Sequence, residues 1–241
     1  MDEILKISNF SKIYAGGKKA ANHINLTVLA GEIHGFIGHN GAGKTTTIRA
    51  VAGVMDFEEG EILIDGRSVK KEPVACKKKL AYIPDNPDLY DYITGFQYLN
   101  YMADMFEVSA HDRSERIHRY AQLFEISDSL GNLISSYSHG MKQKTALIGA
   151  LLHEPKLLIL DEPFVGLDPE ASFHLKKIMR ELCQRGSAIF FSTHVLDVAE
   201  KLCDKISIIK NGELISSGTM EEVKGSSSLE DVFMEVVEHE Q

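Results

Sequence analysis

The chain has few cysteines and no long apolar run, and each absence limits what it can be. Cys76, Cys183 and Cys203 lie far apart in 241 residues and show no metal-type spacing. Such a sparse, odd number predicts free thiols in a reducing compartment. No stretch of the sequence approaches the roughly 18 consecutive apolar residues of a membrane-spanning helix. We therefore expect the chain to act at a membrane only through a partner.

The start of the given sequence shows no targeting pattern, and basic residues are not in excess. The first ten residues, MDEILKISNF, lack a basic region followed by a long apolar one, so we expect no signal peptide. The formal net charge is -9, from 35 acidic and 26 basic residues. This balance disfavours binding to nucleic acid. We interpret the short lysine runs at 70–71 and 77–79 as solvated surface.

The apolar pattern indicates alternating strands and helices. Apolar residues make up 44% of the chain and charged residues 25%, which is enough apolar material for a sizeable core. Strands are predicted at 3–8, 22–29, 33–37, 60–66, 80–83, 157–160, 188–191 and 206–209. Helices are predicted at 45–52, 95–106, 112–124, 140–153 and 169–185. This order predicts a mostly parallel sheet covered on both faces, with a helical insert near residues 85–140.

A glycine-rich loop follows the predicted strand at 33–37. Residues 38–45 read GHNGAGKT and match the pattern G-x-x-x-x-G-K-[ST]. Glycines let backbone N–H groups approach phosphate oxygens, and the start of the next helix adds a positive dipole end. Lys44 is expected to reach the β- and γ-phosphates, and the Thr45 hydroxyl to bind Mg²⁺. A plain surface turn is the alternative, but the strand before the loop and the helix after it favour a phosphate site.

Two acidic residues follow the apolar strand at 157–160. The end of a parallel strand is where an open sheet binds its ligand. Asp161 can hold Mg²⁺ directly or through water, and Glu162 can take a proton from an attacking water. The alternative is an ordinary turn after a strand. The phosphate loop earlier in the chain favours the catalytic interpretation.

A second helix start carries the most specific resemblance. Residues 137–144 read YSHGMKQK and resemble L-S-G-G-Q, the signature loop of the ATP-binding cassette (ABC) family. Serine and glycine at a helix N-terminus form an anion site. In that family this loop binds the γ-phosphate held by a second cassette. The resemblance therefore implies that Ser138, His139, Gly140 and Met141 act in trans in a head-to-tail pair.

Other family elements follow in the expected order over residues 3–222. Tyr14 matches the aromatic residue that stacks on adenine, residues 165–168 resemble the D-loop, and residues 192–194 resemble the switch segment. The resemblance implies nucleotide contacts from Tyr14, Gly38, His39, Asn40, Gly41, Ala42, Gly43, Lys44, Thr45 and Thr46, and Mg²⁺ ligands at Thr45, Asp161 and Asp85. It also implies catalytic roles for Glu162, His194 and Lys44, and a D-loop role for Asp168.

Three of these residues also have plainer interpretations. Tyr14 could be a packing aromatic, His194 a capping or core histidine, and Asp168 a helix N-cap. The N-cap and D-loop roles of Asp168 are compatible with each other.

The family also implies a fold and its divisions. We expect an α/β protein with a P-loop NTPase (RecA-like) core of mostly parallel strands, an N-terminal antiparallel β subdomain and an inserted helical subdomain. The expected ABC ATPase domain spans 1–222, with the helical subdomain at about 86–140, and a helical tail spans 223–241. The tail and the run GKTTTIR at 43–49 resemble cassettes of bacterial ABC-2-type exporters. An amphipathic helix docked on the core is the alternative for the tail.

Two parts of the pattern depart from the family. The family has a glutamine after the strand at 80–83, where this chain has Pro84, Asp85 and Asn86. We hypothesise that Asp85 takes this role with altered Mg²⁺ coordination, with Asn86 as the second candidate. In the signature loop, Tyr137, His139 and Met141 replace leucine, glycine and glutamine. His139 could add a positive charge when protonated, or its ring could point to solvent.

The expected activity is Mg²⁺-dependent ATP hydrolysis that drives transport, with export as the direction. The expected partners are an integral-membrane subunit and a second cassette, identical or different, and no nucleic acid. The expected location is cytoplasmic, on the inner face of the cell membrane.

Two alternatives stay open. One is a soluble ABC ATPase acting on nucleic acid or the ribosome, although such relatives usually carry two cassettes or a long coiled-coil insertion. The other is a weakly hydrolysing ATP-binding cassette with a regulatory role.

Overall fold

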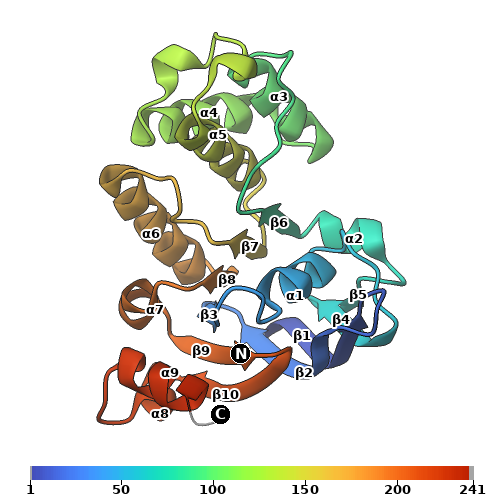
Figure 1. Ribbon diagram of the computed structural model, residues 1–241. Coiled ribbons are helices and arrows are strands. Elements are labelled where there is room, and N and C mark those ends of the chain that lie inside the picture. The colour runs from blue at the N-terminus through green and yellow to red at the C-terminus, as the bar shows by residue number, and fades with distance from the viewer. Residues whose placement is uncertain (1, 239–241) are drawn as a thin grey trace.

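The computed structural model describes residues 2–238 and contains two β-sheets (Figure 1). The smaller sheet has the strand order β2-β1-β4-β5, and each neighbouring pair is antiparallel. Its strands are β1 (Glu3–Ile13), β2 (Lys19–Leu29), β4 (Glu59–Ile64) and β5 (Arg67–Ser68). Strand β1 departs from strict alternation because its pairing with β2 shifts register between Glu3 and Leu5, so that Ile4 and Leu5 are both buried.

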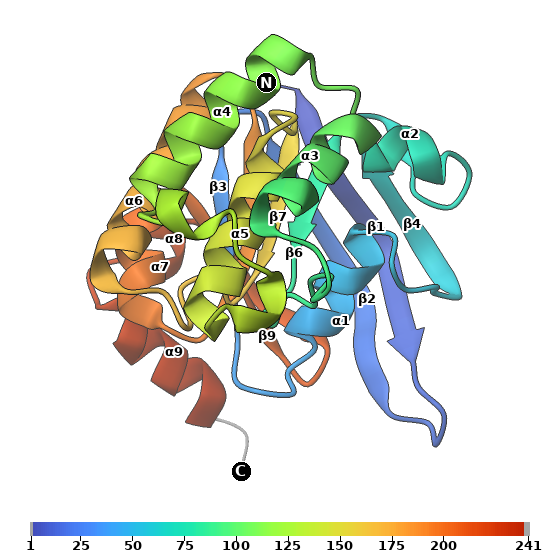
Figure 2. The same cartoon turned by 90° about the horizontal axis from the view of Figure 1, so that it is seen from above.

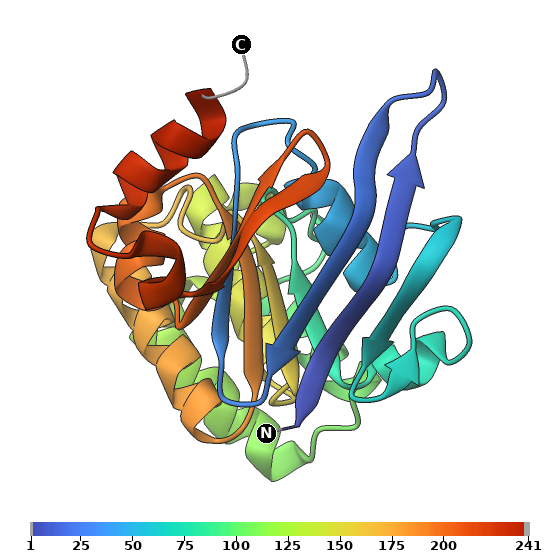
Figure 3. The same cartoon turned by 90° about the horizontal axis from the view of Figure 1, so that it is seen from below.

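The larger sheet has the strand order β10-β9-β3-β8-β7-β6. Its strands are β3 (Ile33–Ile37), β6 (Leu80–Ile83), β7 (Leu157–Asp161), β8 (Ala188–Thr193), β9 (Lys205–Lys210) and β10 (Glu213–Thr219). All neighbours pair in parallel except β9 and β10, which form an antiparallel hairpin. Figure 3 shows this hairpin beside β2, where the Asn22 backbone N–H donates to the Gly212 carbonyl at 2.8 Å.

The parallel strands are buried on both faces, which explains their nearly continuous apolar sequences. Along β7, Leu157 and Ile159 face one core while Leu158 and Leu160 face the other. The first core also holds α1 (Lys44–Val51) and the antiparallel sheet. The second core holds α6 (Pro169–Gln184) and the helices described next. The sheet therefore fixes the phosphate loop and the acidic strand end between two packed layers.

Three helices gather away from the antiparallel sheet in Figure 1, and Figure 2 shows them from above, in front of the strands of the larger sheet. They are α3 (Gly95–Met105), α4 (Ala110–Leu123) and α5 (His139–Leu151). Two short 3₁₀ turns, η1 (Ser127–Ser129) and η2 (Ile134–Ser136), connect α4 to α5. Within the described residues, no helix combines the length and apolar character needed to cross a membrane.

The predicted fold class is confirmed: an α/β chain with an antiparallel sheet and a mixed sheet of mostly parallel strands. The sequence patterns did not predict β10, nor the short helices α2 (Pro73–Lys77), α7 (Leu196–Leu202) and α8 (Met220–Lys224). The final helix, α9 (Leu229–Glu238), packs on α7 and buries Leu229. Residues 239–241 of the predicted tail lie outside the described residues. All three cysteines are free and buried.

Candidate functional site

The site forms where neighbouring strands of the larger sheet end. Strands β3, β8 and β7 are adjacent and parallel, so the segments that follow them meet at one edge of the sheet. A cavity of about 260 Å³ lies there. Its lining joins the phosphate loop to segments distant in sequence and consists of Tyr14, Lys18, Ala20, His39, Asn40, Gly41, Gly43, Lys44, Thr45, Thr46, Asp85 and Glu162. Of the predicted nucleotide contacts, Gly38 and Ala42 are in the loop but not in this lining.

The phosphate loop is held in a shape that requires glycine at Gly43. Its φ is +113°, and a Cβ there would lie 2.2 Å from the Ala20 carbonyl oxygen. Lys44 begins α1 and is almost fully buried. Its Nζ donates to the carbonyl oxygens of Gly38 at 2.6 Å and His39 at 3.3 Å. The ammonium group thus lies inside the curve of the loop.

Asp161 ends β7 as a buried carboxylate with one free oxygen. Only 1% of the residue is exposed. The Ser192 hydroxyl donates to Oδ1, whereas Oδ2 has no hydrogen-bond partner among the described residues. Burial raises the pKa of Asp161, and the nearby Ser192 and Thr45 hydroxyls partly oppose this. The unsatisfied Oδ2 of Asp161 and the Thr45 hydroxyl are both oxygen ligands, the type that Mg²⁺ prefers. The residues present therefore fit a magnesium ion.

Glu162 occupies the centre of the site with an unusual backbone. Its φ is +49°, in the left-handed region that few non-glycine residues adopt. Its backbone N–H donates to Ser192 Oγ at 3.0 Å. One carboxylate oxygen lies 2.9 Å from His194 Nδ1, and the other lies 3.5 Å from Lys44 Nζ. Glu162 therefore contacts both other predicted catalytic residues, one through each carboxylate oxygen.

Tyr14 and Asp85 both line the cavity, from segments far apart in the sequence. The Tyr14 hydroxyl lies 3.3 Å from Thr46 Oγ1 and donates to Met55 Sδ at 3.3 Å. The residue is 43% exposed, so Tyr14 is not a core packing aromatic. Asp85 lines the cavity and its charge acts on Asp161, whereas Asn86 is not part of the described lining. Asp85 thus lies at the cavity, and its role in the glutamine position stays a prediction.

The signature-loop residues lie outside this cavity and against the D-loop segment of the same chain. Ser138 caps α5 by accepting a hydrogen bond from the Met141 backbone N–H at 3.3 Å. The His139 ring lies against Gly166, where a Cβ would be 2.6 Å from His139 Cδ2. The ring therefore packs on the chain rather than projecting only into solvent. Gly166 has φ +81°, which also favours glycine.

Asp168 has the predicted capping role. Its side chain accepts a hydrogen bond from the Ala171 backbone N–H at 2.8 Å, and α6 starts at Pro169. It also forms an ion pair with Lys144 of α5 at 2.7 Å. The Ala171 N–H, followed by Lys144, lowers the pKa of Asp168.

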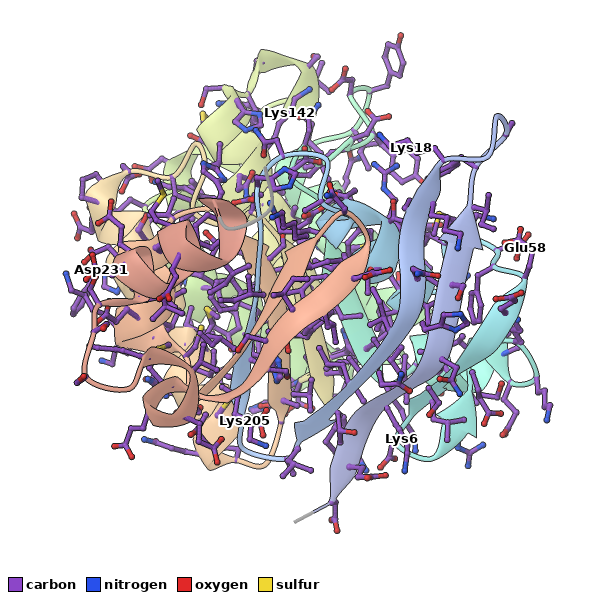
Figure 4. All side chains as sticks on the ribbon, turned by 60° about the horizontal axis from the view of Figure 1, so that its bottom comes forward. Lys6, Lys18, Glu58, Lys142, Lys205 and Asp231 are labelled. Atoms are coloured by element: carbon purple, nitrogen blue, oxygen red, sulfur yellow. The ribbon has the colours of Figure 1, made fainter. Side chains whose placement is uncertain are left out.

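Three further residues belong to the site although the sequence assigned them no role of their own; of these, Ser192 was noted only as part of the switch segment. Ser192 joins Asp161 to the backbone of Glu162, because β7 and β8 pair with Asp161 opposite Ser192. Lys18 and Ala20 line the cavity from the end of the β1–β2 hairpin, and Figure 4 labels Lys18 on this side of the molecule. Their closeness in sequence to Tyr14 was the available signal.

Comparison with known proteins decides the family. A family model described as ABC transporter matches residues 21–165. The chain belongs to the ABC transporter family.

Relatives of this ABC cassette agree over most of its length. The uncharacterized ABC transporter ATP-binding protein YhcH of Bacillus subtilis (strain 168) is 39% identical over 219 residues, covering 89% of this chain and 70% of that protein. The ABC-type transporter ATP-binding protein EcsA of the same organism is 34% identical over 223 residues and 90% of each chain. A solved ATP-binding subunit of an ABC transporter superposes with a TM-score of 0.93 at 33% identity, covering 97% of this chain and 99% of that one. The cassette is thus an ATP-binding subunit of an ABC transporter.

Proposed function

We propose that this ABC cassette hydrolyses ATP and uses the reaction to drive transport through a separate membrane subunit. One observation carries the proposal: a single cavity brings together the phosphate loop, Tyr14, Asp85 and Glu162, with Asp161 directly behind it. These groups come from four separate parts of the chain. Together they supply an adenine contact, a phosphate cradle, oxygen ligands and a base.

Mg²⁺ fits the oxygen-rich side of this cavity. Thr45, Asp161 and Asp85 would hold it, and when bound it neutralises charge on the phosphate oxygens. The free Oδ2 of Asp161 supports this assignment, because a buried carboxylate oxygen without a partner is costly unless a cation or donor meets it.

Glu162 is the proposed general base. A base must lie within reach of the water that it activates and hold its charge there. Glu162 lines the cavity. Lys44 lies next to one of its carboxylate oxygens and His194 next to the other. Lys44 and His194 are also placed to stabilise charge on the phosphoryl group as it transfers. The proposed step is attack of water on the γ-phosphorus, which breaks the bond to the bridging β-phosphate oxygen and releases ADP and phosphate, while the water proton passes to Glu162.

The γ-phosphate is proposed to be covered by a second cassette. Ser138 and Gly140 lie at the start of α5 and outside the cavity of their own chain, so their backbone and hydroxyl groups can serve a neighbour. Two such cassettes, identical or different, would close over two ATP molecules and open after hydrolysis.

The membrane subunit is proposed to contact a groove of about 380 Å³ that is lined by most of the segment 80–89. Residues on both sides of Asp85 line this groove, among them Ile83, Pro84 and Pro87, together with Met102 and Met105 of α3. Asp85 itself lines the nucleotide cavity. One short segment therefore lines both the nucleotide cavity and the groove. This supports the proposal that the helical insert at 86–135 transmits its motion to the membrane subunit.

The remaining parts of the proposal rest on the family resemblance. They are a location on the inner, cytoplasmic face of the membrane and export as the direction. The proposed division has an ATPase domain at 1–222, an inserted helical part at about 86–140 and a tail from 223.

The test measures ATP turnover and ATP-dependent light scattering for the wild type and for Glu162→Gln. The exposed Glu125 is a matched control, because it shares the left-handed backbone with φ +56° but lies away from the site. We expect Glu162→Gln to lower turnover by roughly 10²–10⁴-fold, the usual contribution of a general base, and to accumulate an ATP-dependent dimer. Glu125→Gln should behave as wild type. Wild-type protein that binds ATP without turnover would instead support a regulatory cassette.

A further inference from the structure

The segment that follows Glu162 packs against the first turns of α5 in the same chain. The contacts are His139 and Gly140 on Gly166, where a Cβ on Gly140 would lie 2.9 Å from the Gly166 carbonyl oxygen. Lys144 pairs with Asp168 two residues further along this segment. The helix that carries the signature residues thus rests on residues 163–168.

Gln143 makes the contact nearest to Glu162. Its side chain is fully buried, and Nε2 donates to the Pro163 carbonyl oxygen at 3.3 Å. Pro163 follows Glu162 directly in sequence, and proline has no N–H of its own to donate. The Gln143 Oε1 atom is buried without a partner among the described residues. A buried amide oxygen without a partner costs free energy, so the presence of Gln143 here calls for a functional explanation.

Lys142 and Thr145, the two polar residues nearest Gln143 that do not contact residues 163–168, bond to other parts of the chain. Lys142, which Figure 4 labels, donates to Asp91 Oδ1 at 2.7 Å, in the segment before α3. The Thr145 hydroxyl donates to the Met141 carbonyl oxygen at 2.8 Å, within α5 itself. Gln143 alone of these three reaches the residue next to the proposed base.

Glu162 is consequently held from both sides. Ser192 accepts a hydrogen bond from its backbone N–H, and Gln143 holds the carbonyl group of the next residue. These contacts maintain a left-handed backbone that a glutamate does not favour on its own. Relaxation of this backbone would turn the carboxylate away from His194 and Lys44.

We propose that Gln143 is a positioning residue for ATP hydrolysis, acting through the backbone of Glu162. This inference rests on the proposed function of Glu162 as the base. It adds that the placement of the base depends on the placement of α5, the helix whose first residues are proposed to serve the partner cassette. Gln143 touches neither ATP nor the reacting water.

The test replaces Gln143 by methionine, which has a similar length and no hydrogen-bonding amide. We expect kcat to fall by roughly 10- to 100-fold, as is usual when a catalytic group is displaced slightly, with KM for ATP nearly unchanged. Thr145→Val is the matched control: Thr145 is as fully buried a residue of α5 as Gln143, and the hydrogen bond that it loses does not reach residue 163. It should keep wild-type turnover. Thermal melting shows whether both variants fold. If Gln143→Met does not fold, Gln143→Asn replaces it, because the shorter side chain moves the amide away from the Pro163 carbonyl oxygen.

A second measurement distinguishes positioning from a general loss of structure. In a Glu162→Gln background the residual turnover should be unaffected by Gln143→Met, because the base through which Gln143 acts is absent. An equal loss in both backgrounds would overturn the inference, and so would a Gln143→Met enzyme with wild-type kcat. Either result leaves the proposed function standing if the wild type turns over ATP. A wild type without turnover would refute the proposed function and, with it, the role of Gln143.

Discussion

His153 predicts a distinctive pH dependence of stability. This residue follows α5 and its ring stacks on Phe106 with centroids 3.7 Å apart. Its Nε2 lies 3.2 Å from the Leu80 carbonyl oxygen, and Nδ1 is buried without a partner among the described residues. Burial, with a smaller contribution from the nearby Arg116 charge, lowers the pKa of His153 from 6.5 to about 4. The folded protein therefore holds this ring neutral at pH 5, where the unfolded chain protonates it.

The sign and size of the effect follow from linkage. Between the two pKa values the unfolded chain binds more protons, so the free energy of unfolding falls as the pH drops through 6.5 and levels off below about 4. At about 1.36 kcal/mol for each pH unit, the full effect is roughly 3 kcal/mol. About 2 kcal/mol of it should be lost between pH 7 and pH 5.

The assay is urea unfolding at pH 7 and pH 5, comparing the wild type with His153→Gln. The variant keeps a side-chain donor for the Leu80 carbonyl group but cannot take up a proton, so its loss between the two pH values should be smaller by about 2 kcal/mol. Buried carboxylates affect both proteins equally and cancel in the comparison. His111→Gln, at an exposed histidine of α4, should lose as much as the wild type. Equal pH dependence in wild type and His153→Gln would refute the reasoning.

Two further predictions concern the phosphate loop and the metal ligands. Gly43→Ala should weaken ATP binding strongly and destabilise the fold by about 2–3 kcal/mol, because the new Cβ meets the Ala20 carbonyl group. Gly41→Ala has a left-handed φ of +83° but open space for the Cβ, so it should destabilise the fold by only about 1 kcal/mol. Calorimetric ATP titration and thermal melting check both variants. Asp161→Asn should raise the Mg²⁺ concentration for half-maximal turnover by roughly tenfold or more, and Asp85→Ala should raise it less. Unchanged Mg²⁺ dependence in Asp85→Ala would remove Asp85 from the metal site.

Local motifs could be predicted from the sequence because their parts are contiguous. The loop at 38–45 and the acidic pair at Asp161 and Glu162 each carry their chemistry within a few residues, between elements with strong apolar patterns. The alternation of strands and helices predicted the mostly parallel sheet, the family resemblance implied the antiparallel subdomain, and the fold class is confirmed. Strand β10 was missed because it lies at the sheet edge, where its residues alternate between exposed and partly buried without a strong apolar pattern.

Contacts between distant segments could not be predicted in this way. Ser192 meets Asp161 only because of the register in which β8 pairs with β7. Likewise, the His139 ring packs on Gly166 because α5 lies against the loop after β7, a relation that neither helical periodicity nor motif spacing encodes. The roles assigned to the site residues remain predictions that the experiments above test.

The segment 80–89 has a consequence for how such transporters diversify. Only Asp85 of this segment lines the nucleotide cavity, whereas most of its neighbours in sequence line the groove. Under the proposed function, substitutions among those neighbours can alter which membrane subunit is accepted while the chemistry at the phosphates stays intact. Grafting a few groove residues should therefore pair a cassette with a new transport subunit and leave the nucleotide cavity unchanged.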